Sequence, residues 1–124
     1  MPRRKIKPRR IALWNANGLA QHKFELEFFL KQQQIDIMLI SETHFIDKNY
    51  LKINGYKFYH TEHPSGKAHG GTGIIIKFSI KHYELPSFQK DYLQATNVVI
   101  KDCYGTITTS ALYCPSRHSI AKED

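Results

Sequence analysis

Long apolar runs and cysteines are scarce in this sequence. No run approaches the roughly 18 apolar residues of a membrane-spanning helix, and no apolar stretch follows the charged N-terminus as it would in a secretory signal. The two cysteines, Cys103 and Cys114, form no CxxC pair, so reduced thiols are the default interpretation. We therefore expect an intracellular protein with no membrane partner and no disulfide framework.

Acidic residues are missing from the first ten positions, which instead carry six basic residues: Arg3, Arg4, Lys5, Lys7, Arg9 and Arg10. Without those six, the formal net charge would fall from +7 to +1. Clustered cations gain affinity for nucleic acids by releasing counterions from phosphates, and they also suit a nuclear import receptor. The sequence predicts a basic disordered arm over residues 1–10. It binds DNA and directs the protein to the nucleus, or it is a solvated tail that aids solubility.

The chain as a whole has the composition of a packed globule, with 41% apolar and 12% aromatic residues. Its length of 124 residues allows one domain or part of one. An apolar strand is predicted over Ile11–Trp14, a helix over Gln21–Gln34 and a second buried strand over Ile35–Ile40. Strand, helix and strand within about 30 residues indicate a βαβ unit, whose two strands must be parallel.

The second half of the chain predicts strands with short connections and no intervening helix. These strands cover Tyr56–His60, residues 72–80, residues 95–100 and Thr106–Tyr113. The pattern indicates a mixed α/β architecture with layered sheets. The one substantial helix has a broad apolar face, which comprises Phe24, Leu26, Phe28, Phe29 and Leu30. One helix leaves sheet faces uncovered, which is a first indication of an incomplete domain.

Polar residues lie at the ends of three of the predicted strands: Asn15, Glu42 and Tyr113. Ligands of open α/β sheets bind at the carboxyl ends of strands, and a carboxylate beside an amide suits a hard cation such as Mg²⁺. Each residue also has an ordinary explanation. Asn15 or Asn17 can shape a turn before Gly18, Glu42 can be a solvated residue, and Tyr113 can be a core aromatic with its hydroxyl at the surface.

Taken together, the segments "LWNANGL", "ISETH", "HGGTGIII" and "LYCPS" resemble the endonuclease/exonuclease/phosphatase superfamily. The likeness is to the apurinic-endonuclease-like domain of jockey-type non-long-terminal-repeat retrotransposons, and it extends from Ile11 to Arg117. The resemblance implies a partial four-layer α/β sandwich, with mixed β-sheets and flanking helices. Residues 11–124 would form its N-terminal half only, as an incomplete domain from a truncated element copy or a partial gene.

The resemblance also implies a chemistry: nicking of DNA by hydrolysis assisted by Mg²⁺ or Mn²⁺, which primes reverse transcription by a downstream reverse transcriptase domain. Glu42 would be the metal ligand, and Asn15 would help orient the metal and the scissile phosphate. Tyr113 would donate a hydrogen bond to that phosphate, while Asn17 and Gly18 would make the turn into the helix.

Two further motifs of the family, a "GDFN"-like and an "SDH"-like segment, do not occur in these 124 residues. The second supplies the general base, whose loss costs about 10²–10⁴ in rate. His118 and Asp124 follow the last strand in the wrong context to replace it. We therefore expect this chain to be catalytically inactive on its own.

Three other interpretations are open. His60, His63 and His69 with a cysteine could form a zinc site, although only the first two have ligand spacing. The chain could instead be a non-enzymatic nucleic-acid-binding remnant that uses its basic arm with Lys67 and Lys77. Finally, it could be an unfolded remnant, which would lack a cooperative thermal transition.

Overall fold

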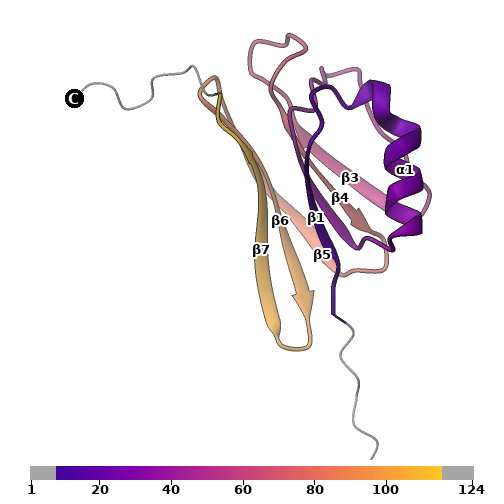
Figure 1. Ribbon diagram of the computed structural model, residues 1–124. Helices are drawn as coiled ribbons and strands as arrows, with labels where there is room; N and C mark the ends of the chain where they lie inside the picture. The colour runs from indigo at the N-terminus through magenta and orange to yellow at the C-terminus, as the bar shows by residue number, and fades with distance from the viewer. Residues whose placement is uncertain (1–7, 116–124) are drawn as a thin grey trace, which may run out of the picture.

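The structure, a computed structural model, describes residues 8–115 and begins with the predicted βαβ unit (Figure 1). Strand β1 (Ile11–Asn15) leads through a 3₁₀ turn (Ala20–His22) into helix α1 (Lys23–Gln32), which is followed by strand β2 (Ile37–Ser41). The two strands pair in parallel, with Ile11 opposite Ile37 and Asn15 opposite Ser41. Both strands therefore end at the same edge, as predicted.

Two further strands complete the first sheet, which we call sheet A. Strands β3 (Tyr56–Thr61) and β4 (Thr72–Lys77) are antiparallel to each other, and the strand order is β1-β2-β4-β3. Strands β2 and β4 are central, and four consecutive residues of β4, Gly73 to Ile76, are buried on both faces. Such continuous apolar runs are typical of strands covered on two sides.

The second sheet, sheet B, is an antiparallel meander of β5 (His82–Lys90), β6 (Leu93–Asp102) and β7 (Gly105–Tyr113). The β6–β7 hairpin was predicted, although β6 is longer than expected. Strand β5 was not predicted. Its pairing register shifts between Leu85 and Phe88, where Pro86 and Ser87 break the alternation of apolar and polar residues. The strand lies at the edge of sheet B, where a proline is tolerated.

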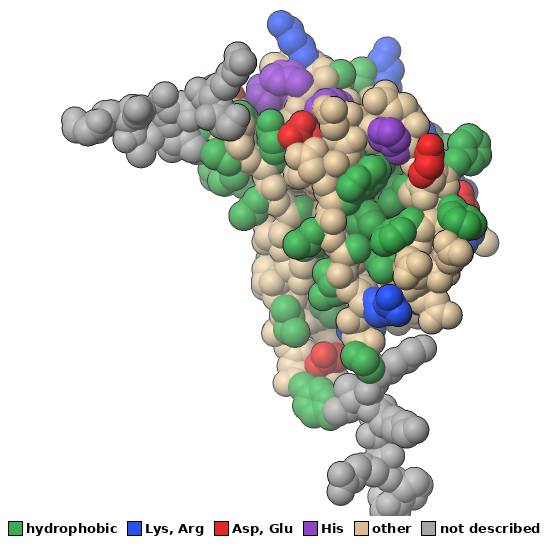
Figure 2. Space-filling model, in the orientation of Figure 1, with side chains coloured by type: hydrophobic (Ala, Val, Ile, Leu, Met, Phe, Trp, Pro, Cys, Tyr) green, Lys and Arg blue, Asp and Glu red, His purple; other side chains and the backbone are tan. Residues whose placement is uncertain are grey.

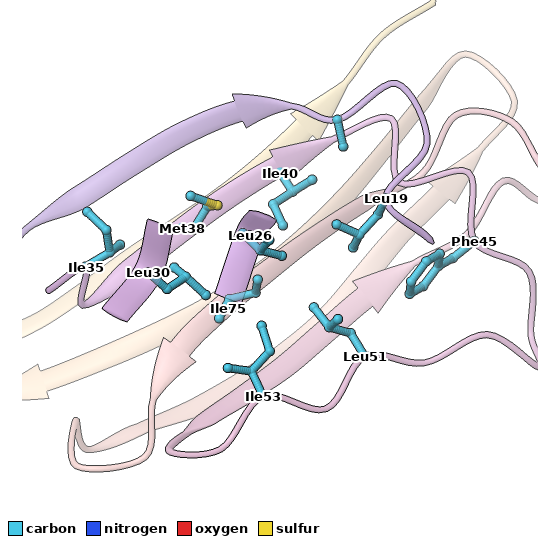
Figure 3. Close-up of a cluster of buried hydrophobic side chains, with 11 residues drawn as sticks. Leu19, Leu26, Leu30, Ile35, Met38, Ile40, Phe45, Leu51, Ile53 and Ile75 are labelled. Carbon is cyan, nitrogen blue, oxygen red and sulfur yellow. The ribbon is translucent and has the colours of Figure 1, made fainter. Parts of the chain in front are cut away.

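Two apolar cores hold the layers together, one on each face of sheet A. The helix-side core lies between α1, the loop before β3 and sheet A, and includes Leu26, Leu30, Phe45 and Ile75 (Figure 3). The inter-sheet core lies between the two sheets and consists of Ile37, Ile74, Ile76, Ile80, Val98, Ile100 and Ala111. Because side chains alternate along a strand, successive isoleucines of β4 point into opposite cores.

Helix α1 differs from its prediction in length and in its buried face. It ends at Gln32, and Gln34 has a positive φ of 52° that no continuing helix adopts. Only Leu26 and Leu30 are buried, one turn apart, whereas Phe24 is 87% exposed and Phe28 is 65% exposed. The helix packs on sheet A through one narrow stripe, so the rest of the expected apolar face remains in solvent.

The layers are therefore a helical layer, sheet A and sheet B, which confirms a mixed α/β architecture with two sheets. These are three of the four layers that the predicted sandwich would have. No helix covers the outer face of sheet B in the part of the chain that the structure describes. Among residues 8–115, no helix has the length and apolar character to cross a membrane.

Candidate active site

The side chains of Asn15 and Glu42 are in direct contact at the end of sheet A. The Asn15 Nδ2–H donates to Glu42 Oε2 at 2.8 Å, where β1 and β2 both finish (Figure 1). The side-chain oxygen of Asn15, Oδ1, also accepts the backbone N–H of Asn17 at 3.1 Å. Asn17 and Gly18 turn the chain, with φ of +45° and +100°. Asn15 thus shapes this turn and also orients the carboxylate of Glu42. From the sequence, the turn was expected of Asn17 and Gly18 and the orienting role of Asn15.

The backbone that carries the carboxylate is held in an uncommon conformation. Glu42 and His44 both have a φ of +57°, a left-handed geometry that costs a non-glycine residue about 1–3 kcal/mol. Backbone hydrogen bonds hold it in place: the N–H of Glu42 donates to Gly71 O at 2.8 Å, and that of His44 donates to Gly70 O at 2.9 Å. The Glu42 side chain is 24% exposed, so it is reachable from solvent.

Gln94, which the sequence patterns did not single out, supports this segment from sheet B. It is completely buried, and its Oε1 accepts the N–H of Gly71 at 3.0 Å. An added Cβ at Gly70 would lie 2.7 Å from Gln94 Oε1, and one at Gly71 would lie 2.6 Å from Thr43 Oγ1. Only glycines fit there. In the sequence, the signals for this support were the pair of glycines itself and a glutamine within an apolar strand.

Tyr113 ends β7 at the same end of the molecule. Its ring lies beside Gly70, where an added Cβ would be 3.6 Å from Tyr113 Cδ2. Burial raises the pKa of the Tyr113 phenol, and the charges of Glu42 and Cys114 raise the pKa further. The hydroxyl therefore keeps its proton at neutral pH and can donate a hydrogen bond. Tyr113 and His44 line one hollow of about 440 Å³.

The structure thus brings the three predicted site residues to one rim. Asn15 lines a neighbouring hollow of about 270 Å³, together with Ser41 and Ser110. Its partner Glu42 is close enough to Tyr113 to act on the pKa of the phenol. The rim offers a carboxylate, an amide that orients it and a protonated hydroxyl. Such a set can hold a divalent cation and bind a phosphate oxygen.

Histidines also gather at this end of the molecule (Figure 2). The rings of His63 and His69 are 4.0 Å apart, and Ser65 Oγ lies 2.9 Å from His63 Nδ1 and 3.2 Å from His69 Nε2. His60 instead stacks on Phe58. Across residues 8–115, no three His, Cys, Asp or Glu side chains are grouped to hold a metal, and both cysteines are free and exposed. The zinc interpretation therefore finds no support there.

Most of the predicted basic arm, including Arg3, Arg4, Lys5 and Lys7, lies outside the described residues. Arg9 and Arg10 are described and exposed, and the N–H of Arg10 donates to Asp36 Oδ2 at 2.7 Å. Arg10 precedes β1, whereas Asn15 ends it, which separates them by about 16 Å at the rise of a strand. The described base of the arm therefore lies at the opposite end of sheet A from the candidate site.

Sequence comparison matches residues 12–122 to the profile of the "Endonuclease/Exonuclease/phosphatase family". The chain is 39% identical over 106 residues to the RNA-directed DNA polymerase from the mobile element jockey of Drosophila melanogaster, covering 86% of this chain and 12% of that protein. It is 38% identical over 111 residues to a probable RNA-directed DNA polymerase from the transposon X-element of Drosophila melanogaster, covering 89% and 12%. The chain thus spans about an eighth of these relatives.

Structural comparison finds the same fold in larger endonuclease chains. The endonuclease domain of TRAS1, a telomere-specific non-LTR retrotransposon, matches with a TM-score of 0.69 and 16% identity, over 92% of this chain and 49% of that chain. An AP endonuclease from Leishmania major matches with a TM-score of 0.66 and 18% identity, over 82% of this chain and 38% of that chain. The chain thus spans half or less of these solved structures.

Proposed function

Because the chain belongs to the endonuclease/exonuclease/phosphatase family, we propose that it contributes the metal-binding half of a site that nicks DNA by phosphodiester hydrolysis. The observation that carries this proposal is the hydrogen bond between Asn15 and Glu42 at the ends of two parallel strands. Tyr113 on the same rim adds a phosphate-binding group. This edge is where ligands bind in open α/β sheets.

The carboxylate of Glu42 fits Mg²⁺ or Mn²⁺ as its ligand. Mg²⁺ retains several waters and is commonly held by one or two carboxylates together with substrate phosphates, so one solvent-reachable carboxylate suffices on the protein side. Glu42 Oε2 accepts from Asn15 at 2.8 Å, and Oε1 lies 3.6 Å from His44 Nε2. When bound, the ion would stabilise negative charge on the phosphoryl oxygens.

The other residues of the rim would orient and bind. Asn15 holds the carboxylate of Glu42 in one direction, because its own side chain is fixed by the turn at Asn17. Tyr113 donates a hydrogen bond to a nonbridging phosphate oxygen, which the raised pKa of its phenol favours by keeping the proton in place. These tasks place the scissile phosphate but do not activate the attacking water.

Activation of the water needs a general base, which we expect from the missing "SDH"-like segment. We therefore propose that the 124-residue chain does not nick DNA on its own. The names of its relatives as RNA-directed DNA polymerases support a role in retrotransposition, in which the nick supplies the primer for reverse transcription. The basic residues near the N-terminus support DNA binding and a nuclear location.

The test is to restore the missing half and remove the proposed metal ligand. The chain is fused to the part of the Drosophila melanogaster jockey protein that follows its matched segment and completes the domain. We expect the fusion to nick supercoiled plasmid with Mg²⁺ and the unfused chain to show no nicking. Glu42→Gln should lower the nicking rate at least about 100-fold, since metal coordination supplies several kcal/mol and about 1.4 kcal/mol corresponds to a tenfold change in rate.

The matched control is Glu25→Gln, which removes an exposed carboxylate from α1 and should leave nicking unchanged. Equal activity of the fusion with and without Glu42→Gln would contradict the proposed role of Glu42. A fusion that retains DNA in a salt-sensitive way without nicking it would favour the alternative, a non-enzymatic nucleic-acid-binding protein with a net charge of +7.

A further inference from the structure

A further hollow, of about 470 Å³, lies at the end of sheet A opposite the candidate site, the lower end in Figure 1. It is bounded by the end of α1, the turn before β3 and the turn after β4, with Lys31, Asn54, Lys77, Phe78 and Ser79 among its lining residues. Strand β4 ends here beside the beginning of β2, whereas β2 ends at the candidate site. The volume falls within the range of about 300–1,000 Å³ that is usual for ligand-binding clefts.

Phe78 is the prominent side chain of this hollow. It is apolar and aromatic, and yet it is 63% exposed. Its backbone N–H donates to Gly55 O at 3.0 Å, and the N–H of Ile80 closes the turn by donating to Lys77 O at 3.1 Å. Because these hydrogen bonds hold the backbone of the turn, the ring is presented to solvent from a fixed position. An exposed aromatic ring of this kind can serve as a stacking platform for a nucleic-acid base.

Lys57, from β3, places a positive charge beside the ring of Phe78. Its Nζ lies 5.9 Å from the centroid of the Phe78 ring and 5.7 Å from that of Tyr59. Attraction between an ammonium group and aromatic rings favours this position. A base stacked on Phe78 would therefore have a cation within reach of its own phosphates.

Positive charge is in excess around this hollow. Both lysines that line it pair with carboxylates, Lys31 with Glu27 at 3.0 Å and Lys77 with Asp36 at 3.2 Å. Among the described residues, the further cations at this end are Arg9, Arg10, Lys57, Lys81 and Lys101, and the further carboxylates are Glu84 and Asp102. A polyanion is therefore the complementary partner for this end of the molecule.

We propose that this hollow binds one nucleotide of a single-stranded nucleic acid, with its base stacked on Phe78 and its phosphates contacting Lys57 and Lys77. The amide of Asn54 and the hydroxyl of Ser79 line the same hollow and can hydrogen-bond the edge of the base. A single strand is the partner rather than a duplex, because stacking on a side chain requires an unpaired base. The hollow and the candidate active site lie at opposite ends of sheet A, so this strand is distinct from the DNA segment to be nicked.

The test is fluorescence anisotropy with the full 124-residue chain in the presence of EDTA. The labelled probes are an oligothymidine, an oligouridine and a DNA duplex of equal length, and the first two distinguish DNA from RNA as the source of the strand. Phe78→Ala should weaken binding of a single strand at least about fivefold, because it removes one stacked base, and should leave duplex binding unchanged. Phe24→Ala is the matched control, since Phe24 is 87% exposed but lies in the first turn of α1, and it should bind as the unsubstituted chain does.

Three outcomes of this measurement would overturn the proposal. They are absence of binding to both single strands, equal affinity of Phe78→Ala and the unsubstituted chain for those strands, and a loss of duplex binding in Phe78→Ala as large as the loss of single-strand binding.

A second measurement keeps an aromatic ring at this position. Phe78→Trp should retain single-strand binding, and unlabelled oligothymidine should quench its tryptophan fluorescence as a base stacks on the indole. The unsubstituted chain gives the background, because its single tryptophan, Trp14, lies near the end of β1 at the candidate site. Equal quenching in the two chains would overturn the proposal. The inference does not rest on nicking, so a fusion that fails to nick DNA would contradict the proposed function and leave this binding site standing.

Discussion

Strained residues at the candidate site are the main feature at the scale of single residues. Four non-glycine residues among positions 8–115 have a positive φ: Asn17, Gln34, Glu42 and His44. Gln34 follows a helix end, where this conformation is common. The other three lie in the two segments that form the rim. Strain of this kind clusters where function requires one geometry, which adds a physical reason to place the site there.

A half-buried histidine with one buried ring nitrogen that lacks a hydrogen-bond partner predicts a pH dependence of stability. His60 Nδ1 has no hydrogen-bond partner in the described part of the chain, and burial lowers the pKa of His60 below its ordinary value of 6.5, partly offset by Glu62. Between the lowered pKa of His60 in the folded state and its ordinary value of 6.5, the unfolded state binds more protons than the folded state. The stabilisation from neutral His60 is thus complete above pH 6.5 and is lost as the pH falls below it.

His60→Phe should therefore raise the free energy of unfolding by about 1 kcal/mol at pH 7.5, since an unsatisfied buried polar group costs about 1–3 kcal/mol. The increase in the free energy of unfolding should be larger at pH 5.5. Urea denaturation at both pH values measures this. Some pH dependence should remain, because burial and the charge of His69 also lower the pKa of His63. If the free energy of unfolding changes between pH 7.5 and pH 5.5 by the same amount in His60→Phe as in the unsubstituted protein, the assignment to His60 is contradicted.

At the scale of elements, the loop between β3 and β4 is joined to the end of β2 through a glycine pair. The carbonyl of Gly71 accepts the N–H of Glu42, and its own N–H donates to Gln94. The "HGG" segment thus connects β6 to Glu42 through two hydrogen bonds of Gly71, so the position of the site carboxylate depends on the position of β6. Its glycines could be recognised in the sequence, but their partners could not, since Gln94 lies 23 residues away from Gly71.

Gly71→Ala should be considerably more damaging than Gly66→Ala. Both glycines have a left-handed φ, +87° and +76°, so an alanine costs each about 1–2 kcal/mol in strain. A Cβ at Gly71 would also lie 2.6 Å from Thr43 Oγ1 and 3.2 Å from Thr61 O, whereas nothing lies within 4 Å at Gly66. Overpacking adds about 1–3 kcal/mol. Equal losses of unfolding free energy in urea would show that the contact at Gly71 is not tight.

At the scale of the whole molecule, β4 belongs to both cores, so the layers should unfold together. Ile75 lies in the helix-side core, and Ile74 lies in the inter-sheet core. The only tryptophan, Trp14, packs against the helix-side core and reports on that layer alone. A chain with this shared strand should show one cooperative transition, unlike an unfolded remnant.

Ile74→Val and Ile75→Val test this cooperativity. Each removes one buried methylene and should lower the free energy of unfolding by about 0.5–1.5 kcal/mol. Both should shift the urea midpoint of Trp14 fluorescence by similar amounts, and the fluorescence and far-ultraviolet circular dichroism transitions should coincide. If Ile74→Val shifts the circular dichroism transition but leaves the Trp14 transition in place, the two cores unfold independently.

Much of the architecture could be predicted because its signals are local. Apolar runs and their spacing indicated β1, α1 and β2, and the helical crossover between β1 and β2 indicated that these two strands are parallel. Strand β5 was missed, since a bulge and Pro86 interrupt its pattern. The apolar face of α1 was overestimated, because periodicity counts apolar residues such as Phe24 without knowing what covers them.

The sequence by itself determined the mixed α/β class, the parallel βαβ unit and the three polar residues at the ends of strands. Only the tertiary structure decided that Asn15 bonds Glu42 across 27 residues of sequence, that Gln94 supports the glycine pair, and that Leu13 of β1 is exposed. The physical reason is the separation along the sequence over which each kind of interaction acts. Strand and turn propensities act over a few neighbouring residues, whereas these contacts depend on how complete sheets pack against each other.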